Sequence, residues 1–281
     1  HVNPKTGRIH ASFKLGGTST GRLSCSNPNI QNPPRDKAFR ALFSAAPGRK
    51  MVVADYGQIE LRVAALVSGD KNMIEAYRKA QDLHRKTAAA IAKVPFEQVT
   101  KNQRQAAKAV NFGLLYGQGA RGLARYAKAG YGVSMSEKEA EEAREAFFRA
   151  YPGLKHWQVE AGRRAEKEMR AITPGGRIRD FTKEPGGYRF TEALNTPIQG
   201  GAAEVMMATL ACLENHLEGM DAKLVNAVHD EIVLEVAEQD TAEAKEAVEK
   251  AMVEGMLAIF PNAGTAGLVE AKSGENWAEG K

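Results

Sequence analysis

Two aspartates of the chain each stand at the end of a run of apolar, β-prone residues. Asp55 follows Met51–Ala54, and Asp230 interrupts the segment Val225–Val236 together with its neighbour Glu231. A single aspartate at such a place usually makes a turn or caps a helix. If the two strands are neighbours, however, the carboxylates come close together, and like charges at short range need a cation or a shared proton. Hard divalent ions such as Mg²⁺ prefer oxygen ligands and support phosphoryl transfer, so the pattern predicts a magnesium site of that kind.

A second group of side chains recurs at every fourth position of one segment. The stripe consists of Arg104, Lys108, Phe112 and Tyr116. On a helix these positions share one slowly drifting face about 18 Å long, while Ala107, Val110 and Leu114 fall on another face that can pack inward. Basic side chains bind phosphates and rings stack on bases, which suits a nucleotide; the alternative is an amphipathic helix with a solvated basic edge. Gly113 and Gly117 favour the nucleotide because they permit close approach by a flat group.

The elements that must position these residues alternate strand and helix at both ends of the chain, with helices between. We expect the first 45 residues to be mostly loop with a strand at Arg8–Phe13, and residues 71–170 to be mostly helical. The other expected elements are a strand at Met51–Ala54, helices at Gln58–Val67, 192–218 and Asp240–Ile259, and a hairpin that carries Asp230. The fold class is therefore expected to be α+β, with an antiparallel sheet flanked by helices and a mostly helical insertion.

The composition bounds the class of protein. The 281 residues suffice for one large domain or two interleaved ones, and a net charge of +5 permits a polyanionic partner without requiring one. Two cysteines, Cys25 and Cys212, exclude a disulfide framework and suit a reducing compartment, and no Cys/His spacing of the zinc type is visible. No apolar run is long enough to span a bilayer, so we expect no membrane partner. His1 in place of an initiator methionine indicates a fragment or a processed product.

Three segments resemble the polymerase motifs of family A DNA polymerases, the bacterial DNA polymerase I type. They are DYGQIELR (55–62), RQAAKAVNFGLLYG (104–117) and VHDE (228–231). Three further segments resemble flanking parts of that family, namely TSTGRLSCSNPNIQNPP (18–34), NTPIQGGAAEVM (195–206) and GENWAEGK (274–281). The matches occur in order over nearly the whole chain, and each motif is long, so together they are specific.

The resemblance implies a catalytic set and a metal site. The implied catalytic residues are Asp55, Lys108, Asp230 and Glu231. Asp55 and Asp230 would hold two Mg²⁺ ions, which Mn²⁺ can replace, with help from the Tyr56 carbonyl. Glu231 is similar to the family's less essential acidic neighbour of the second aspartate.

The resemblance also implies a nucleotide site. Its members are Gln58, Glu60, His84, Arg104, Lys108, Phe112 and Tyr116. The two basic residues would grip the triphosphate of a dNTP with help from His84, and Phe112 would pack on the sugar and base. Tyr116 would pair with Glu60, whose side chain would crowd the ribose 2′ position and exclude ribonucleotides.

Primer–template DNA is the second implied partner. The implied DNA contacts are Arg22, Gly117, Asn195, Gln199 and His229. Two positions depart from the family pattern: Gly57 stands where the family usually has serine, and Thr191 where it usually has arginine. The second departure removes the basis for one template contact.

The resemblance divides the chain into family domains. Residues 1–71 and 191–281 would form the palm and residues 72–190 the fingers, with the thumb and exonuclease domains absent. A chain without the thumb is expected to extend primers distributively and with strong salt sensitivity. We expect a monomer, placed in the cytoplasm with the nucleoid if the source is bacterial or a phage, or in an organelle.

The leading functional hypothesis is a DNA-directed DNA polymerase core acting in replication or repair. One alternative is a thumb-less fragment that binds dNTP or nucleic acid without efficient turnover. A single-subunit RNA polymerase shares two palm aspartates, but Glu60 and Phe112 argue against it. Reverse transcription is a variant that the sequence leaves open.

Overall fold

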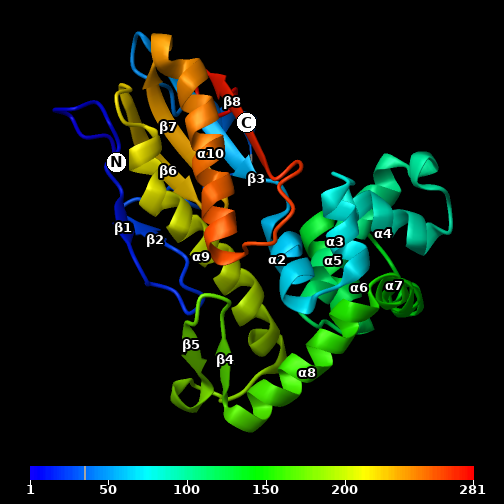
Figure 1. Ribbon diagram of the computed structural model, residues 1–281. Coiled ribbons are helices and arrows are strands. Elements are labelled where there is room, and N and C mark those ends of the chain that lie inside the picture. Colours follow the sequence, from blue (N-terminus) through cyan, green and yellow to red (C-terminus); the bar gives the residue numbers. More distant parts are fainter. Residues whose placement is uncertain (35) are drawn as a thin grey trace. The chain divides into compact units, whose positions relative to one another are not determined.

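The computed structural model describes residues 1–34 and 36–281, which form two compact units. The first unit is built from both ends of the chain, residues 1–59 and 200–281, and the second consists of residues 60–199. The expected α+β class is confirmed, with an antiparallel sheet in the first unit and mainly helices in the second (Figure 1). The assignment of residues 1–71, 72–190 and 191–281 to palm and fingers stays a prediction. Within the described residues, no helix is both long and apolar enough to cross a bilayer.

The sheet of the first unit has four antiparallel strands in the order β6-β7-β3-β8. The strands are β3 (Arg49–Tyr56), β6 (Ala222–Val228), β7 (Glu231–Ala237) and β8 (Val269–Gly274). Side chains of β3 alternate between two covered faces: Val52, Ala54 and Tyr56 point one way, and Met51 and Val53 the other. Both sets are buried, which explains why this strand reads as a nearly continuous apolar run.

Two long helices cover one face of this sheet. They are α9 (Phe190–His216), whose residues from Gly200 onward belong to the first unit, and α10 (Thr241–Ile259). Figure 1 shows α10 lying along the strands. The Tyr56 hydroxyl reaches both helices, since it donates to the carbonyl oxygen of Met252 at 2.5 Å and bonds the Thr209 hydroxyl at 2.6 Å. The two helices approach so closely that a Cβ added at Gly255 would collide with Oγ1 of Thr209.

The other face of the sheet is covered by the chain's C-terminal segment and by part of its N-terminal segment. Met51, Val53, Val228, Val233 and Trp277 form one buried cluster. The short elements nearby are α1 (Lys37–Ala41), β1 (Ser12–Lys14) and β2 (Ser24–Ser26), and the turn η3 (Glu238–Asp240) precedes α10.

The strand expected at Arg8–Phe13 is wrong in its bounds. Only Ser12–Lys14 pairs, with Ser24–Ser26, and Ile9 makes a single bridge with Val2. The reason is local, because the N–H of Gly7 donates to the carbonyl oxygen of Asn3 in a turn and Gly7 adopts a positive φ of 66°. The other expected elements are present with ends shifted by one to two residues.

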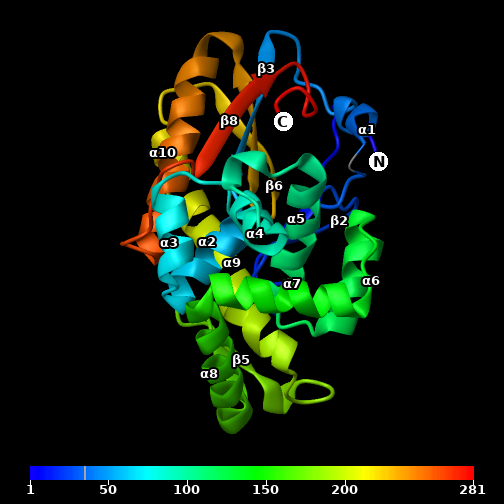
Figure 2. The same cartoon turned by 90° about the vertical axis from the view of Figure 1, so that its right-hand side faces the viewer.

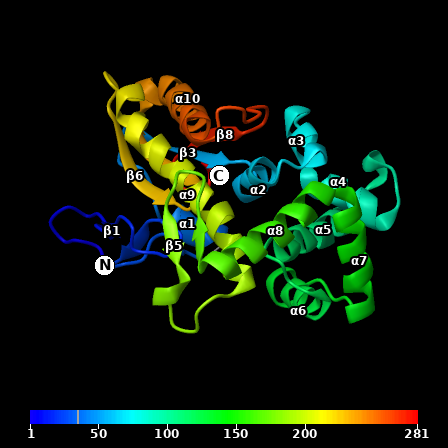
Figure 3. The same cartoon turned by 60° about the horizontal axis from the view of Figure 1, so that its bottom comes forward.

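The second unit is mainly helical. Its helices are α2 (Ile59–Ser68, whose first residue belongs to the first unit), α3 (Lys71–Arg78), α4 (Leu83–Ala92), α5 (Lys101–Leu115), α6 (Ala120–Tyr131), α7 (Glu137–Ala150) and α8 (Pro152–Glu168), with the turns η1 (Phe96–Gln98) and η2 (Phe181–Lys183). A small hairpin of β4 (Arg170–Ile172) and β5 (Ile178–Asp180) follows α8. Figures 2 and 3 show α4, α5, α6 and α7 grouped around one another. Capping boxes at Thr100 and Ser136 define where α5 and α7 begin.

Candidate active site

The pairing of β3 with β7 brings the two motif aspartates together. Asp55 lies opposite Glu231 in the antiparallel register, and the N–H of Tyr56 donates to the carbonyl oxygen of Asp230 at 3.0 Å. Neighbouring strands are about 4.8 Å apart, so the two aspartates are adjacent at one end of the sheet. The expectation that their strands are neighbours is confirmed.

Backbone strain accompanies both aspartates. His229 and Asp230 form the two-residue turn between β6 and β7, and His229 has a φ of 55°. Gln58, three residues after Asp55, has a φ of 59°. Residues other than glycine adopt this left-handed conformation only at a cost of about 1–3 kcal/mol, and such strained residues are concentrated at functional sites.

The carboxyl group of Asp55 lies in an acidic, partly desolvated environment. Its side chain is 44 % exposed, which leaves it within reach of solvent. Burial raises the pKa of Asp55 to about 6; the Lys281 ammonium lowers it, and the Glu231 carboxylate raises it further. A carboxyl group that ionises reluctantly beside other carboxylates favours a divalent cation as the compensating charge. The oxygen-rich donor set of Asp55, the Tyr56 carbonyl and Asp230 therefore fits Mg²⁺.

Glu231 is held by the C-terminal segment. Its side chain is fully buried, and its carboxylate accepts hydrogen bonds from Nε1 of Trp277 at 2.6 Å and from the Lys281 ammonium. The Lys281 nitrogen also lies 3.8 Å from an oxygen of Asp55. The segment GENWAEGK thus contributes two residues to the carboxylate site that sequence reasoning did not assign.

Arg40 is a third residue that the sequence did not reveal. Its positive charge lowers the pKa of Asp55, and its guanidinium stacks over the Trp277 ring at 5.1 Å. Nothing in the sequence around Arg40 marks it, because its role depends on the tertiary contact between α1 and the C-terminal segment.

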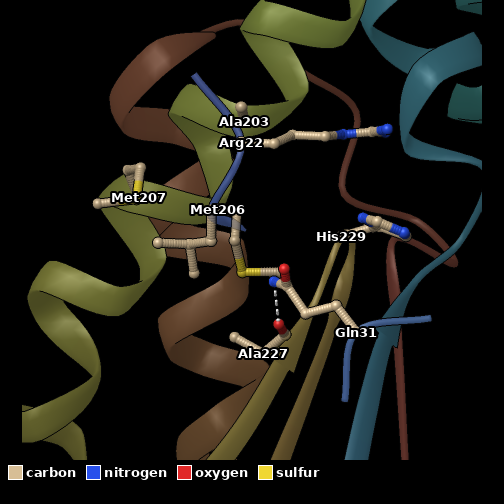
Figure 4. Close-up of a pocket in the computed structure, with 8 residues that line it drawn as sticks. Arg22, Gln31, Ala203, Met206, Met207, Ala227 and His229 are labelled. Carbon is tan, nitrogen blue, oxygen red and sulfur yellow. Dashed lines mark hydrogen bonds between the residues drawn. The ribbon is translucent and has the colours of Figure 1, made fainter. Parts of the chain in front are cut away.

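The N-terminal segment is fastened to β6 beside the His229 turn. Gln31, which is buried, donates from Nε2 to the carbonyl oxygen of Ala227 at 2.7 Å, and Asn226 donates to the carbonyl oxygen of Ile30 at 3.2 Å. Figure 4 shows that Arg22 and His229 line the same hollow as Gln31 and extend toward one side of it. The structure therefore brings two of the expected DNA contacts together, and Gln31 is a positioning residue that the sequence analysis missed.

In the second unit, α5 carries the expected stripe. Arg104, Lys108, Phe112 and Tyr116 are all half-buried, whereas Ala107, Val110 and Leu114 are buried in the packed interior. The expected division of this helix into two faces is confirmed. Tyr116 stands just beyond the last helical residue, as the C-cap.

Arg104 is engaged by an acidic residue that the sequence analysis did not assign. Its Nε donates to Oδ2 of Asp82 at 2.5 Å. Oδ1 of the same carboxylate accepts from the N–H groups of His84 and Arg85 and so caps α4. Burial raises the pKa of Asp82, but the hydrogen bond and charge of Arg104 outweigh it and hold the pKa below its usual value.

His84 is a buried histidine on the first turn of α4, with an exposed fraction of 2 %. Burial is the largest cause that lowers its pKa to about 4, so the ring is neutral at physiological pH. Asn111 lies on the neighbouring α5, with Nδ2 placed 2.7 Å from Nδ1 of the ring, and the ring centroid of Phe112 is 5.7 Å away. One ring N–H of His84 therefore remains available to donate a hydrogen bond.

Glu60 and Tyr116 form the pair that the family resemblance implied. The Tyr116 hydroxyl donates to Oε2 of Glu60 in a short hydrogen bond. The glycines near the rings have a different explanation from the one expected. A Cβ at Gly113 would lie 2.7 Å from Leu123, and one at Gly117 would lie 2.6 Å from the Phe190 ring, so neighbouring side chains of the chain itself fill the space beside both glycines.

Asn195 and Gln199 lie four residues apart on α9, and both are half-buried. This spacing places them on one side of the helix. Their role toward DNA stays an expectation from the family.

Comparison with known proteins agrees with the motifs. The sequence profile of DNA polymerase family A matches residues 1–279. DNA polymerase I of Aquifex aeolicus is 42 % identical over 88 % of this chain and 42 % of its own length. DNA polymerase I of Pseudomonas aeruginosa is 37 % identical over 99 % of this chain and 31 % of its own length. The thermostable DNA polymerase I of Thermus aquaticus is 37 % identical over all of this chain and 34 % of its own length.

A solved structure has the same fold. The POL domain of Pol1 from M. smegmatis, in complex with DNA primer-template and dNTP, superposes with a TM-score of 0.88 at 31 % identity and covers 99 % of this chain and 49 % of its own. The chain spans less than half the length of each of these relatives. The chain belongs to DNA polymerase family A.

Proposed function

We propose that the chain is the core of a DNA-directed DNA polymerase that acts in DNA replication or repair. The observation that carries the proposal is the β3–β7 register, which puts Asp55 and Asp230 at one end of the sheet in a chain of family A. In the reaction, the primer 3′-hydroxyl attacks the α-phosphate of a dNTP, a new phosphodiester forms, and pyrophosphate leaves.

The first unit supplies the carboxylates. Asp55, the Tyr56 carbonyl and Asp230 would hold two Mg²⁺ ions, or Mn²⁺ in their place. When bound, the ions lower the pKa of the attacking hydroxyl and balance the charge of the phosphates. Asp55 and Asp230 keep their positions because paired strands fix both main chains. Glu231 orients the C-terminal segment through Trp277 and Lys281.

The second unit supplies the nucleotide contacts. Arg104 and Lys108 bind the triphosphate. Arg104 first gives up its ion pair with Asp82 and then binds phosphate oxygens instead. His84 donates a hydrogen bond from its ring N–H to a phosphate oxygen. Phe112 packs on the sugar and base. Gln58, although it belongs to the first unit, completes the expected set.

Glu60 selects the sugar. Its hydrogen bond with the Tyr116 hydroxyl fixes the carboxylate, and a fixed side chain near the ribose 2′ position excludes a hydroxyl there by crowding. The proposed substrate is therefore a dNTP, in preference to an rNTP.

Primer–template DNA is the proposed partner. Arg22, His229, Asn195, Gln199 and Gly117 are the proposed contacts. The expected consequence is that DNA affinity falls with salt concentration, since each DNA phosphate that the protein neutralises contributes to this fall. We expect a monomer that works in the cytoplasm beside the DNA.

Primer extension tests the proposal. The 281-residue chain is incubated with Mg²⁺, a labelled primer–template and either dNTPs or rNTPs at low salt. We expect products longer by one or more nucleotides with dNTPs only. Extension with rNTPs at an equal rate would contradict the proposal and favour an RNA polymerase.

A second candidate function is nucleotide or DNA binding without efficient turnover. The observation that favours it is the Lys281 ammonium, which lies beside Asp55 and Glu231 and competes with a divalent cation for them. Binding of a fluorescent dNTP with no extended product would support this candidate. If the Lys281→Ala variant extends the primer and the wild type does not, Lys281 is the group that prevents turnover.

A further inference from the structure

A thiol, an imidazole and a carboxylate meet on the helical face of the first unit. Cys212 and His216 lie on α9 and Glu254 lies on α10, and their potential ligand atoms are all within 4.8 Å of one another. Nε2 of His216 and Oε2 of Glu254 are 2.7 Å apart. None of these three residues takes part in the proposed polymerase reaction.

The main chain beneath the cluster is held firmly. Cys212 and His216 are four residues apart and therefore share one face of α9, an arrangement that helical zinc sites use for paired ligands. Glu254 precedes Gly255, where α10 approaches α9 so closely that an added Cβ would collide with Thr209. The Cys212 thiol points into this junction, with Sγ 3.3 Å from the carbonyl oxygen of Thr209 and 3.6 Å from that of Ala251.

We propose that Cys212, His216 and Glu254 form a binding site for Zn²⁺, with solvent as the remaining ligand. In zinc sites the sulfur, nitrogen and oxygen donors lie about 2.0–2.3 Å from the ion, so tetrahedral neighbours are about 3.3–3.8 Å apart. Rotation about the outer side-chain bonds can bring the ligand atoms to these distances. Nε2 of His216 and Oε2 of Glu254 must move apart, and the other ligand atoms must move closer together, by no more than about 1 Å in each case.

The chemistry of the donors decides which ion the site takes. Thiolate and imidazole ligands favour Zn²⁺ and reject Mg²⁺, so this cluster and the aspartate site bind different metals. On binding, the Cys212 thiol proton leaves to solvent, and the His216 ring carries its proton on Nδ1 so that Nε2 can bind the ion. An open groove bordered by His216, Glu246, Lys250, Val253 and Glu254 leaves room for the bound water.

A bound ion would join α9 to α10 and stabilise the first unit. Any ligand that binds the folded but not the unfolded chain stabilises it by mass action. No zinc-type spacing is visible in the sequence because Cys212 and His216 become candidate ligands only together with Glu254, which lies 38 residues beyond His216.

Cobalt spectroscopy tests the proposal. Co²⁺ is added to the 281-residue chain in a phosphine reductant with excess Mg²⁺, and Zn²⁺ is then titrated against it. We expect one Co²⁺ per chain with a thiolate-to-cobalt charge-transfer band and intense visible bands, both abolished by stoichiometric Zn²⁺. Ions at the aspartate site have only oxygen ligands and cannot give the thiolate band.

Variants assign the ligands. Cys212→Ser should abolish the charge-transfer band and weaken Zn²⁺ binding by at least about tenfold, and Glu254→Gln should weaken it while retaining the band.

The matched control is Cys25→Ser, which removes the other cysteine of the same unit and should change neither the band nor the affinity for Zn²⁺. Zn²⁺ should also raise the melting temperature of the wild type but not of His216→Ala. The absence of a thiolate band in the wild type, or its loss in Cys25→Ser alone, would overturn the proposal.

Discussion

Arg104 and Asp82 form an ion pair in the second unit, with Nε and Oδ2 2.5 Å apart. The same carboxylate caps α4 through its other oxygen, so one side chain both begins that helix and holds the arginine proposed to bind phosphate. Nucleotide binding must therefore break or loosen this pair. Asp82 is a competitor for Arg104 as well as its anchor.

The first prediction concerns this competition. Asp82→Asn keeps an N-cap oxygen but removes the charge, so Arg104 is released without loss of α4. A half-exposed ion pair contributes about 0.2–1 kcal/mol, so the dNTP should bind up to about fivefold more tightly. Fluorescent dNTP titration measures this. Asp36→Asn, at the cap of α1, is the control and should change nothing. Weaker binding by Asp82→Asn would show that the carboxylate chiefly positions Arg104.

The second prediction concerns sugar selection. Glu60→Ala removes the carboxylate that the Tyr116 hydroxyl fixes, so rNTP incorporation should rise relative to dNTP by roughly tenfold or more. Tyr116→Phe keeps the carboxylate but frees it to move, and should give a smaller rise. Competition between dATP and ATP in primer extension reports the ratio. An unchanged ratio in Glu60→Ala would show that another group reads the sugar.

The third prediction concerns Gly57, where the family usually has serine. A Cβ at Gly57 would lie 2.9 Å from the carbonyl oxygen of Gly267, so Gly57→Ser must displace the loop before β8. We expect a loss of about 1–3 kcal/mol in the free energy of unfolding. Urea unfolding checks it, with Gly122→Ala as control, because a Cβ there meets Gln118 only at ordinary contact distances of 3.6 Å and more. Equal stability of wild type and Gly57→Ser would mean that the loop yields freely.

The fourth prediction follows from the raised pKa of Asp55. The folded-state pKa is about 6, compared with an ordinary value of 3.8, so between these pH values the folded chain binds more protons than the unfolded chain. Stability contributed by this group is therefore lost as pH rises from about 4 to 6. Asp55→Asn should be more stable than the wild type at pH 7.5 in EDTA, and this advantage should shrink to about a third near pH 4.5 and vanish only below about pH 4.

Unfolding by urea at the two pH values, with and without Mg²⁺, measures the effect. Mg²⁺ should stabilise the wild type at pH 7.5 more than it stabilises Asp55→Asn. An advantage of Asp55→Asn that is equal at both pH values would contradict a raised pKa.

The sequence predicted the parts of the site whose signals are local. Asp55 and Asp230 end β-prone runs, and the four-residue spacing of α5 predicted one stripe and one buried face. Both predictions agree with the structure because the periodicity of a strand or a helix depends only on residues close together in the sequence.

Other parts of the site depend on contacts distant in sequence. The Glu231–Trp277 hydrogen bond joins residues 46 positions apart, and Arg40 approaches Asp55 only through tertiary packing. Asp82 carries no signal of its own in the sequence, because its bond to Arg104 spans 22 positions. Gly113 and Gly117 were read as space for a ligand because the sequence does not show Leu123 and Phe190 beside them.

Single-turnover nucleotide incorporation is the most direct test of the proposed role of the two aspartates. Wild type, Asp55→Asn and Asp230→Asn are compared in Mg²⁺ at saturating dNTP and primer–template, with Asp36→Asn as control. We predict a fall of at least about a thousandfold in rate for each of the two aspartate variants and none for the control. A rate within tenfold of wild type for either variant would contradict the assignment of Asp55 and Asp230 as the metal-binding carboxylates.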